Sequence, residues 1–296
     1  MLMNTSERAV GVLGSGTMGS GIAITMLLAG HRVRLYDLDE ERASQGVRAV
    51  EKFLARSVAL GKLTGERRDV MLARVDPVAA VEQLGPCDVI VEAIIEDLGA
   101  KQRLLTLLDD VCSPSTLFHT NTSTLSVTAI AAGSRHPERV IGTHFCNPAP
   151  LMSLVEVVRG RRTGDEQYNE TLRFIEQLSK RPVQCRDTPG FIVNFFLVPF
   201  ENDCIRALEA GMGTIEEIDR AVTLGLRYPM GTFRLLDIVG LDIHRAVSTS
   251  LYEQLRDPRF AAPALVDRMI SAGQLGRKTG EGFYTYQTED AMRASA

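Results

Sequence analysis

The sequence lacks a long apolar run. None of its apolar stretches approaches the roughly 18 to 20 residues that a membrane-spanning helix needs. The first residues, 1–8, are polar and do not contain the apolar centre of a signal peptide. We therefore expect a cytoplasmic protein with no membrane partner.

An excess of positive charge and a regular cysteine framework are also absent. The 33 Lys and Arg residues against 37 Asp and Glu give a net charge of −4, so no nucleic acid partner is expected. The cysteines are odd in number and are not spaced as metal ligands, which argues against a disulfide framework and a metal site; they are Cys87, Cys112, Cys146, Cys185 and Cys204. The composition, 45% hydrophobic and 24% charged, is that of one large or two medium-sized globular domains.

Short apolar runs alternate with helical segments in the first half of the chain. Residues 9–13 are apolar, a glycine turn follows, and residues 18–29 have the pattern of a helix. The polar and apolar alternation of residues 31–36 completes a strand, helix, strand unit. Further strands are predicted at residues 87–91, 116–121, 140–145 and 154–158. This order predicts an α/β domain of Rossmann type, with a mostly parallel sheet covered by helices on both faces.

The pattern changes near residue 187. Thr188-Pro189-Gly190 precedes a long helical segment, and no convincing strand of a parallel sheet follows it. We therefore predict a first domain of residues 1–187, with a helical excursion at about residues 40–75, and an all-helical domain of residues 188–296. The apolar residues 191–200 suit either an internal core or a subunit interface.

A dinucleotide-binding motif is present at the first predicted turn. Gly14, Gly16 and Gly19 form GxGxxG between a predicted strand and a predicted helix. The glycines allow a tight turn and a close approach to a pyrophosphate, and the helix N-terminus offers N–H groups to it. Asp37 ends the next strand, where a carboxylate can bind the ribose of NAD and repels the ribose phosphate of NADP. The motif predicts an NAD site, although FAD also binds to similar motifs.

A stripe of basic residues follows on the helix predicted over residues 40–60. Arg48, Lys52 and Arg56 recur every four residues, so they lie on one side of that helix. Two interpretations are open. The stripe is either a solvated helix face or a clamp for phosphate groups.

A histidine and a glutamate form a candidate proton relay. His144 ends an apolar strand, at the edge where doubly wound sheets bind their ligands. Glu156 lies within the next apolar run, where a charge needs a partner. Twelve residues suffice for the chain to return, so the carboxylate can pair with the imidazole.

Longer motifs give the sequence a resemblance to the short-chain L-3-hydroxyacyl-CoA dehydrogenase family, which includes 3-hydroxybutyryl-CoA dehydrogenases. They occur in order over nearly the whole chain. The matching segments are GSGTMGSGIA (14–23), VEAIIED (91–97), NTSTLS (121–126), HFCNPAPLMSLVEVV (144–158), PGFIVN (189–194), YPMGTFRLLDIVGLD (228–242) and GRKTGEGFY (276–284).

The resemblance implies a role for individual residues. It implies a catalytic dyad of His144 and Glu156, with Ser123 and Asn194 around the reacting oxygen. Around coenzyme A it implies Lys52, Arg56, Ser123 and Asn194, with Arg56 standing where many relatives have lysine. Around NAD it implies Gly14, Gly16, Thr17, Met18, Gly19, Asp37, Glu96, Lys101, Ser123, Asn147 and Lys278.

The resemblance also implies an activity and an assembly. The expected reaction is the reversible NAD-dependent oxidation of an L-3-hydroxyacyl-CoA, most simply 3-hydroxybutyryl-CoA, by a homodimer that associates through its second domain. A 3-hydroxyacyl carrier-protein dehydrogenase and a 3-hydroxyadipyl-CoA dehydrogenase remain alternatives. A dinucleotide-binding structural protein without turnover is a more distant one, against which the intact His144 and Glu156 argue.

Overall fold

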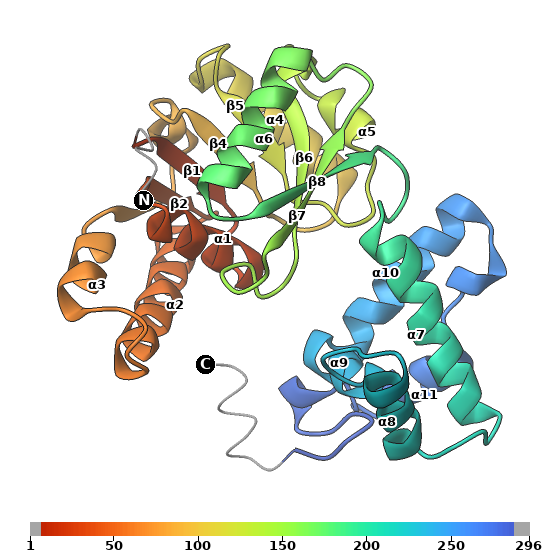
Figure 1. Ribbon diagram of the computed structural model, residues 1–296. Coiled ribbons are helices and arrows are strands. Elements are labelled where there is room, and N and C mark those ends of the chain that lie inside the picture. Colours follow the sequence, from red (N-terminus) through yellow and green to blue (C-terminus); the bar gives the residue numbers. More distant parts are fainter. Residues whose placement is uncertain (1–6, 287–296) are drawn as a thin grey trace. The chain divides into compact units, whose positions relative to one another are not determined.

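The computed structural model describes residues 7–286 and divides into two compact units, Met1–Phe191 and Ile192–Ala296 (Figure 1). The division lies close to the predicted boundary at residues 187 and 188. Among the residues described, no helix combines the length and apolar character needed to cross a membrane.

The first unit is built on one sheet of eight strands in the order β3-β2-β1-β4-β5-β6-β7-β8. All neighbours are parallel except β6 and β7, which run antiparallel. This arrangement confirms the predicted Rossmann-type, mostly parallel sheet. The strands are β1 (Ala9–Leu13), β2 (Arg32–Tyr36), β3 (Val75–Val78), β4 (Val89–Glu92), β5 (Leu117–Thr120), β6 (Val140–Phe145), β7 (Leu154–Arg159) and β8 (Arg181–Arg186).

Helices cover both faces of the sheet. Side chains alternate between the faces along each strand. Val89 and Val91 pack with α1 (Thr17–Leu28), α2 (Glu40–Ala59) and α6 (Asp165–Gln177), whereas Ile90 packs with α4 (Leu98–Val111) and α5 (Val127–Ala131). The strands of the sheet's centre are therefore apolar on both faces. Single 3-10 turns, η1 (Val81–Leu84) and η2 (Pro137–Arg139), precede β4 and β6.

The predicted helical excursion contains α2 and a shorter helix, α3 (Gly65–Leu72). The side chain of Asp39 accepts a hydrogen bond from Arg42 N at 2.8 Å and so caps the start of α2. Thr64 caps α3 in the same way. The chain then returns to the sheet as β3, an edge strand that the sequence did not predict.

The second unit is helical, as expected. Its core contains Phe233, Leu236 and Phe283, and Gly240 separates two of its helices with a φ of +101°. His244 is buried between Glu201, whose Oε2 lies 3.0 Å from Nδ1, and Asn202, whose Oδ1 lies 3.0 Å from Nε2. The helices are α7 (Val193–Glu209), α8 (Ile215–Gly225), α9 (Thr232–Val239), α10 (Leu241–Leu255) and α11 (Ala264–Ser271), with 3-10 turns η3 (Pro258–Phe260) and η4 (Arg277–Thr279).

Candidate active site

The register of the strands brings four polar side chains together near the carboxyl ends of β4, β5 and β6. Glu92 is paired with Thr120 across β4 and β5, and Thr120 is paired with Gly142 across β5 and β6. His144 lies two residues beyond Gly142, hence on the same face, and it is paired directly with Glu156 across the antiparallel β6 and β7. The parallel strands have their carboxyl ends here, which is the side of such sheets where ligands bind.

The predicted His144–Glu156 pair forms a hydrogen-bonded chain with a serine. Glu156 is completely buried, and its Oε2 lies 2.7 Å from His144 Nδ1. Ser123 Oγ lies 3.1 Å from the other ring nitrogen, Nε2. An ionised carboxylate can only accept, so it selects the tautomer with the proton on Nδ1. Nε2 is then an acceptor, towards which the Ser123 hydroxyl donates.

The dyad lies in an apolar, shielded environment. His144 is 7% exposed, and its ring centroid lies 5.8 Å from that of Phe191. The thiol of Cys185, on β8, lies 3.6 Å from Glu156 Oε1. Burial, with the nearby Glu156 charge, raises the pKa of the Cys146 thiol to about 11, so Cys146 is not a thiolate nucleophile at neutral pH. The available base in this group is the imidazole.

The glycine turn has the geometry that a pyrophosphate requires. Gly14 has a φ of +93°, and a Cβ on it would lie 2.6 Å from Ala93 O. A Cβ on Gly19 would lie 1.6 Å from Gly14 O, whereas no atom lies within 4 Å of one on Gly16. Gly16 is also the N-cap of α1 and contributes no side-chain hydrogen bond there. Thr17 beside it is exposed, so the N-terminus of α1 offers its backbone N–H groups to an anion.

Asp37 is held against this turn. Its Oδ2 accepts hydrogen bonds from Ser15 N at 2.8 Å and from Ser15 Oγ at 2.6 Å. Burial opposes the ionisation of Asp37, but these bonds and one from Leu38 N outweigh it and lower the pKa of the carboxyl group. Asp37 is therefore an anion at the end of β2, beside the GxGxxG turn.

Glu96 and Lys101 lie beneath the Ser123 loop. Glu96 Oε1 accepts hydrogen bonds from Thr122 Oγ1 at 2.7 Å and from the backbone N–H groups of Ser123 and Thr124 at 2.8 and 3.0 Å. Burial raises the pKa of Glu96, but the charge of Lys101 and these bonds prevail and lower it. Lys101 itself is fully buried. Sequence reasoning did not single out its partner, Glu92, although an acidic residue at the end of an apolar strand was a usable signal.

The other predicted residues belong to the loop after β6, to α2 or to the second unit. Asn147 is exposed in the loop after β6. Lys52 and Arg56 are both exposed on α2, whereas Arg48 of the same stripe pairs with Glu41. Two further residues belong to the second unit: the half-buried Asn194 in the first turn of α7, and the exposed Lys278 on η4, which pairs with Asp242. Within the described residues, no group of histidine, cysteine and acidic side chains is arranged to hold a metal ion.

Comparison with known proteins yields two family matches that together span most of the chain. Residues 9–188 match the family model "3-hydroxyacyl-CoA dehydrogenase, NAD binding domain". Residues 190–286 match the model "3-hydroxyacyl-CoA dehydrogenase, C-terminal domain".

Individual relatives agree with these matches. The chain is 39% identical over 286 residues to a 3-hydroxybutyryl-CoA dehydrogenase of Mycobacterium tuberculosis, with 96% of this chain and all of the relative covered. It is 41% identical to a 3-hydroxyadipyl-CoA dehydrogenase of Escherichia coli, with 97% of this chain and 61% of that protein covered. The crystal structure of (S)-3-hydroxybutyryl-CoA dehydrogenase PaaH1 from Ralstonia eutropha superimposes with a TM-score of 0.89 at 36% identity, covering 96% of this chain and all of that one. The chain therefore belongs to the 3-hydroxyacyl-CoA dehydrogenase family and is an NAD-dependent dehydrogenase.

Proposed function

We propose that this dehydrogenase interconverts a short L-3-hydroxyacyl-CoA and its 3-oxoacyl-CoA, with His144 as the group that takes up and returns the hydroxyl proton. The observation that carries the proposal is the chain of hydrogen bonds from Glu156 through His144 to Ser123. When bound, NAD accepts the hydride that leaves the carbon atom. The protein must then remove the proton from the alcohol oxygen as the carbonyl forms.

His144 and its neighbours suit this proton transfer. Nε2 is the basic nitrogen of the favoured tautomer, and the substrate hydroxyl would take the place of the Ser123 hydroxyl as donor or lie beside it. Once the proton is transferred, the ring is a cation, which the buried Glu156 carboxylate stabilises at 2.7 Å. Asn194 and Ser123 are our candidates to donate hydrogen bonds to the reacting oxygen.

The dinucleotide would lie across the start of α1. Gly14, Gly16, Thr17, Met18 and Gly19 would surround its pyrophosphate, and the anionic Asp37 would bind the adenosine ribose. We propose Glu96, Ser123, Asn147 and Lys278 as further contacts, on the strength of the motifs they belong to. We propose Lys101 as a contact on the same ground, and its buried ammonium group also pairs with Glu92 and Glu96.

The coenzyme A phosphates would bind on α2. Lys52 and Arg56 are exposed one helical turn apart, so two cations face solvent on the same side of the helix. Phosphate groups are the ligands that such a pair attracts most strongly. A carrier-protein substrate would use the same surface through its phosphopantetheine phosphate.

Turnover on a panel of substrates tests this proposal. The purified protein is assayed with NADH and, in separate reactions, acetoacetyl-CoA, a longer 3-oxoacyl-CoA, 3-oxoadipyl-CoA and an acetoacetyl carrier protein. We expect the highest kcat/KM with acetoacetyl-CoA. A preference for 3-oxoadipyl-CoA would favour the specificity named for the Escherichia coli relative, and a preference for the carrier protein would favour a biosynthetic enzyme. Tight NADH binding without turnover on any substrate would favour a structural dinucleotide-binding protein.

We further propose that the chain forms a homodimer through the second unit. That unit carries exposed apolar side chains that a monomer would leave in water, among them Phe196, Leu224 and Leu226, which are 68%, 68% and 56% exposed. Light scattering should give twice the chain mass of 32.5 kDa. A mass of one chain at assay concentrations would contradict the dimer, and Phe196→Glu should shift a true dimer towards monomer.

A cytoplasmic location stays a prediction of the sequence.

A further inference from the structure

The turn before β8 carries a buried lysine whose side chain reaches back to the loop after β6. Lys180 lies between α6 and β8 and is 8% exposed. Its Nζ donates hydrogen bonds to the backbone carbonyl oxygens of Ala149 and Met152 at 2.7 Å each, and to that of Pro150 at 3.1 Å. An ammonium group has three protons to donate, so the loop receives all of them.

The partners of this ammonium group are neutral. All three are carbonyl groups, and burial lowers the pKa of Lys180. A buried cation is costly unless its hydrogen bonds are well placed. Methionine would fill the same space with a similar apolar stem and no charge. What the lysine supplies beyond that stem is a set of three donors for the loop.

Few other contacts hold this loop. Of residues 146–153, all of which the structure describes, Ala149 alone is buried. It packs on α1, where a Cβ built on Gly21 would lie 3.4 Å from Ala149 Cβ and from Pro150 Cδ. The loop is therefore held mainly by its contact with α1 and by Lys180.

The loop contains Asn147, our candidate NAD contact. Asp37, which we propose to bind the adenosine ribose, follows β2, whereas His144, which acts beside the carbon atom that gives up the hydride, lies in β6. The dinucleotide must therefore run across the carboxyl ends of the strands from β2 towards β6. Asn147 comes three residues after His144, so it belongs to the nicotinamide end of this path.

We propose that Lys180 is a positioning residue, which holds the loop of residues 146–153 so that Asn147 reaches the nicotinamide half of NAD. The inference rests on the proposed contact between Asn147 and NAD. Without the ammonium group, three carbonyl groups of the loop lose their donor. The free energy of ordering the loop then opposes the binding of the cofactor.

The experiment compares the binding of NADH and of ADP-ribose, which lacks the nicotinamide, to the full chain carrying Lys180→Met. We expect the dissociation constant for NADH to rise about tenfold and that for ADP-ribose to change by less than about twofold. In the apo protein, hydrogen exchange should rise at the N–H groups of Leu151 and Met152, which both donate to Pro148 O, at 3.0 and 3.1 Å. Lys180→Gln keeps two donors and should weaken NADH binding by about threefold, so it provides the test if Lys180→Met does not fold.

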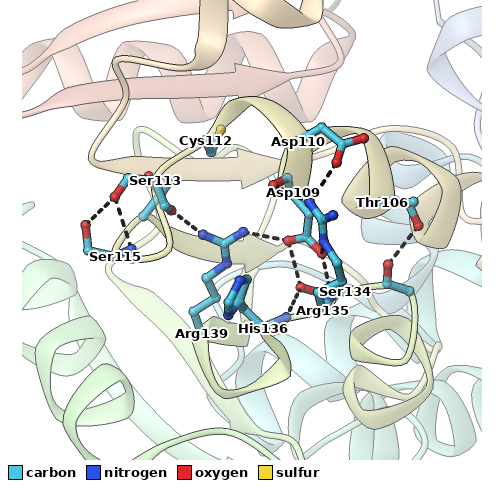
Figure 2. Close-up of polar contacts among 12 residues, drawn as sticks. Thr106, Asp109, Asp110, Cys112, Ser113, Ser115, Ser134, Arg135, His136 and Arg139 are labelled. Atoms are coloured by element: carbon cyan, nitrogen blue, oxygen red, sulfur yellow. Dashed lines mark hydrogen bonds and ion pairs between the residues drawn. The ribbon is translucent and has the colours of Figure 1, made fainter.

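A buried cation before β6 supplies a matched control (Figure 2). Arg139 is 1% exposed, donates to the carbonyl oxygen of Ser113 and pairs with Asp109 at 2.5 Å. Ser113 and Arg139 precede β5 and β6, so this cluster lies at the amino ends of the strands, away from the dinucleotide. Asp109→Asn/Arg139→Met removes the cation together with its anion. It should lower the Tm, while both dissociation constants and the exchange of Leu151 and Met152 stay within about twofold of wild type.

Further outcomes decide between this role and its rivals. Because Lys180 acts through Asn147, adding Lys180→Met to an Asn147→Ala enzyme should raise the dissociation constant for NADH by less than about twofold more. A full tenfold effect in that background, equal losses of NADH and ADP-ribose affinity, or unchanged exchange at Leu151 and Met152 would overturn the inference. If Asn147→Ala leaves NADH affinity unchanged, the proposed contact itself is refuted. If Asn147→Ala weakens NADH binding and Lys180→Met does not, only the positioning role is refuted.

Discussion

The replacement Glu156→Gln should separate the charge of the dyad from its shape. Glutamine has nearly the same volume as glutamate, so the buried position on β7 remains filled. It loses the anion 2.7 Å from His144 Nδ1 and can present an N–H group there, which would favour the tautomer with the proton on Nε2. Both changes weaken the base and the cation that forms on it.

The size of the loss follows from the strength of the bond removed. Hydrogen bonds to a charged group contribute about 1.5–3 kcal/mol. At about 1.4 kcal/mol for each factor of ten, kcat should fall by about 10- to 150-fold. The assay is the oxidation of NADH with saturating acetoacetyl-CoA, accompanied by the Tm and the dissociation constant for NADH.

A second buried pair supplies the control. In the helical unit, Glu201 lies 3.0 Å from His244 and is also buried. Glu201→Gln should lower the Tm while kcat stays within about twofold of wild type. If Glu156→Gln lowers the Tm but leaves kcat within about threefold, Glu156 is a structural residue and does not take part in the relay. Equal losses of kcat in the two variants would also refute a specific role for the Glu156 charge.

Three further predictions concern the cofactor, the substrate handle and acid stability. Because the anionic Asp37 repels a ribose phosphate, kcat/KM should be at least about tenfold higher with NAD than with NADP, about 1.4 kcal/mol; in Asp37→Ser the ratio should fall towards one, and an unchanged ratio would contradict the assignment. Lys52→Ala/Arg56→Ala should raise KM for acetoacetyl-CoA by about tenfold with little change in kcat, whereas Arg220→Ala, on the second unit, should not; an unaltered KM would make the stripe a solvated face. Burial lowers the pKa of His119 to about 3. As the pH falls, His119 of the unfolded chain is therefore protonated before His119 of the folded protein. The neutral His119 makes its full contribution to the free energy of unfolding above about pH 6.5, and between about pH 6.5 and 3 that free energy falls by up to about 1.4 kcal/mol per pH unit. Denaturant unfolding at pH 7 and 5 should show a smaller loss of stability in His119→Gln, and equal losses would contradict this.

The central strands were predictable from sequence because they are apolar on both faces. The edge strands β3 and β8 were not, since each pairs on one side only and contains a proline, Pro77 in β3 and Pro182 in β8. Proline is tolerated at a sheet edge, where it also hides the strand signal. The alternation of β8 is further obscured by charged and polar residues at its ends.

The site was predictable where a residue's type and its neighbours along the chain fixed its chemistry. Asp37 could be placed beside the glycine turn, and Glu156 beside His144, from spacing and the need to pair a buried charge. The network of Glu92, Lys101 and Glu96 depends on contacts between β4, α4 and the loop after β5, which no local pattern encodes. For the same reason, a lysine on an apparently ordinary helix face gave no sign of being buried.

The direct pairing of His144 with Glu156 across an antiparallel hairpin has a consequence for engineering. Both residues are fixed by hydrogen-bonded backbone that is also anchored to β5 and β8, so the connecting residues 146–153 do not have to hold the pair together. The positions of this loop other than Asn147, our candidate NAD contact, and the buried Ala149 can therefore be exchanged for other residues to change the surroundings of the dyad. A one-residue slip in the strands themselves would instead turn one member of the pair to the opposite face of the sheet. A library for new acyl substrates should therefore randomise those loop positions and leave the strands unchanged.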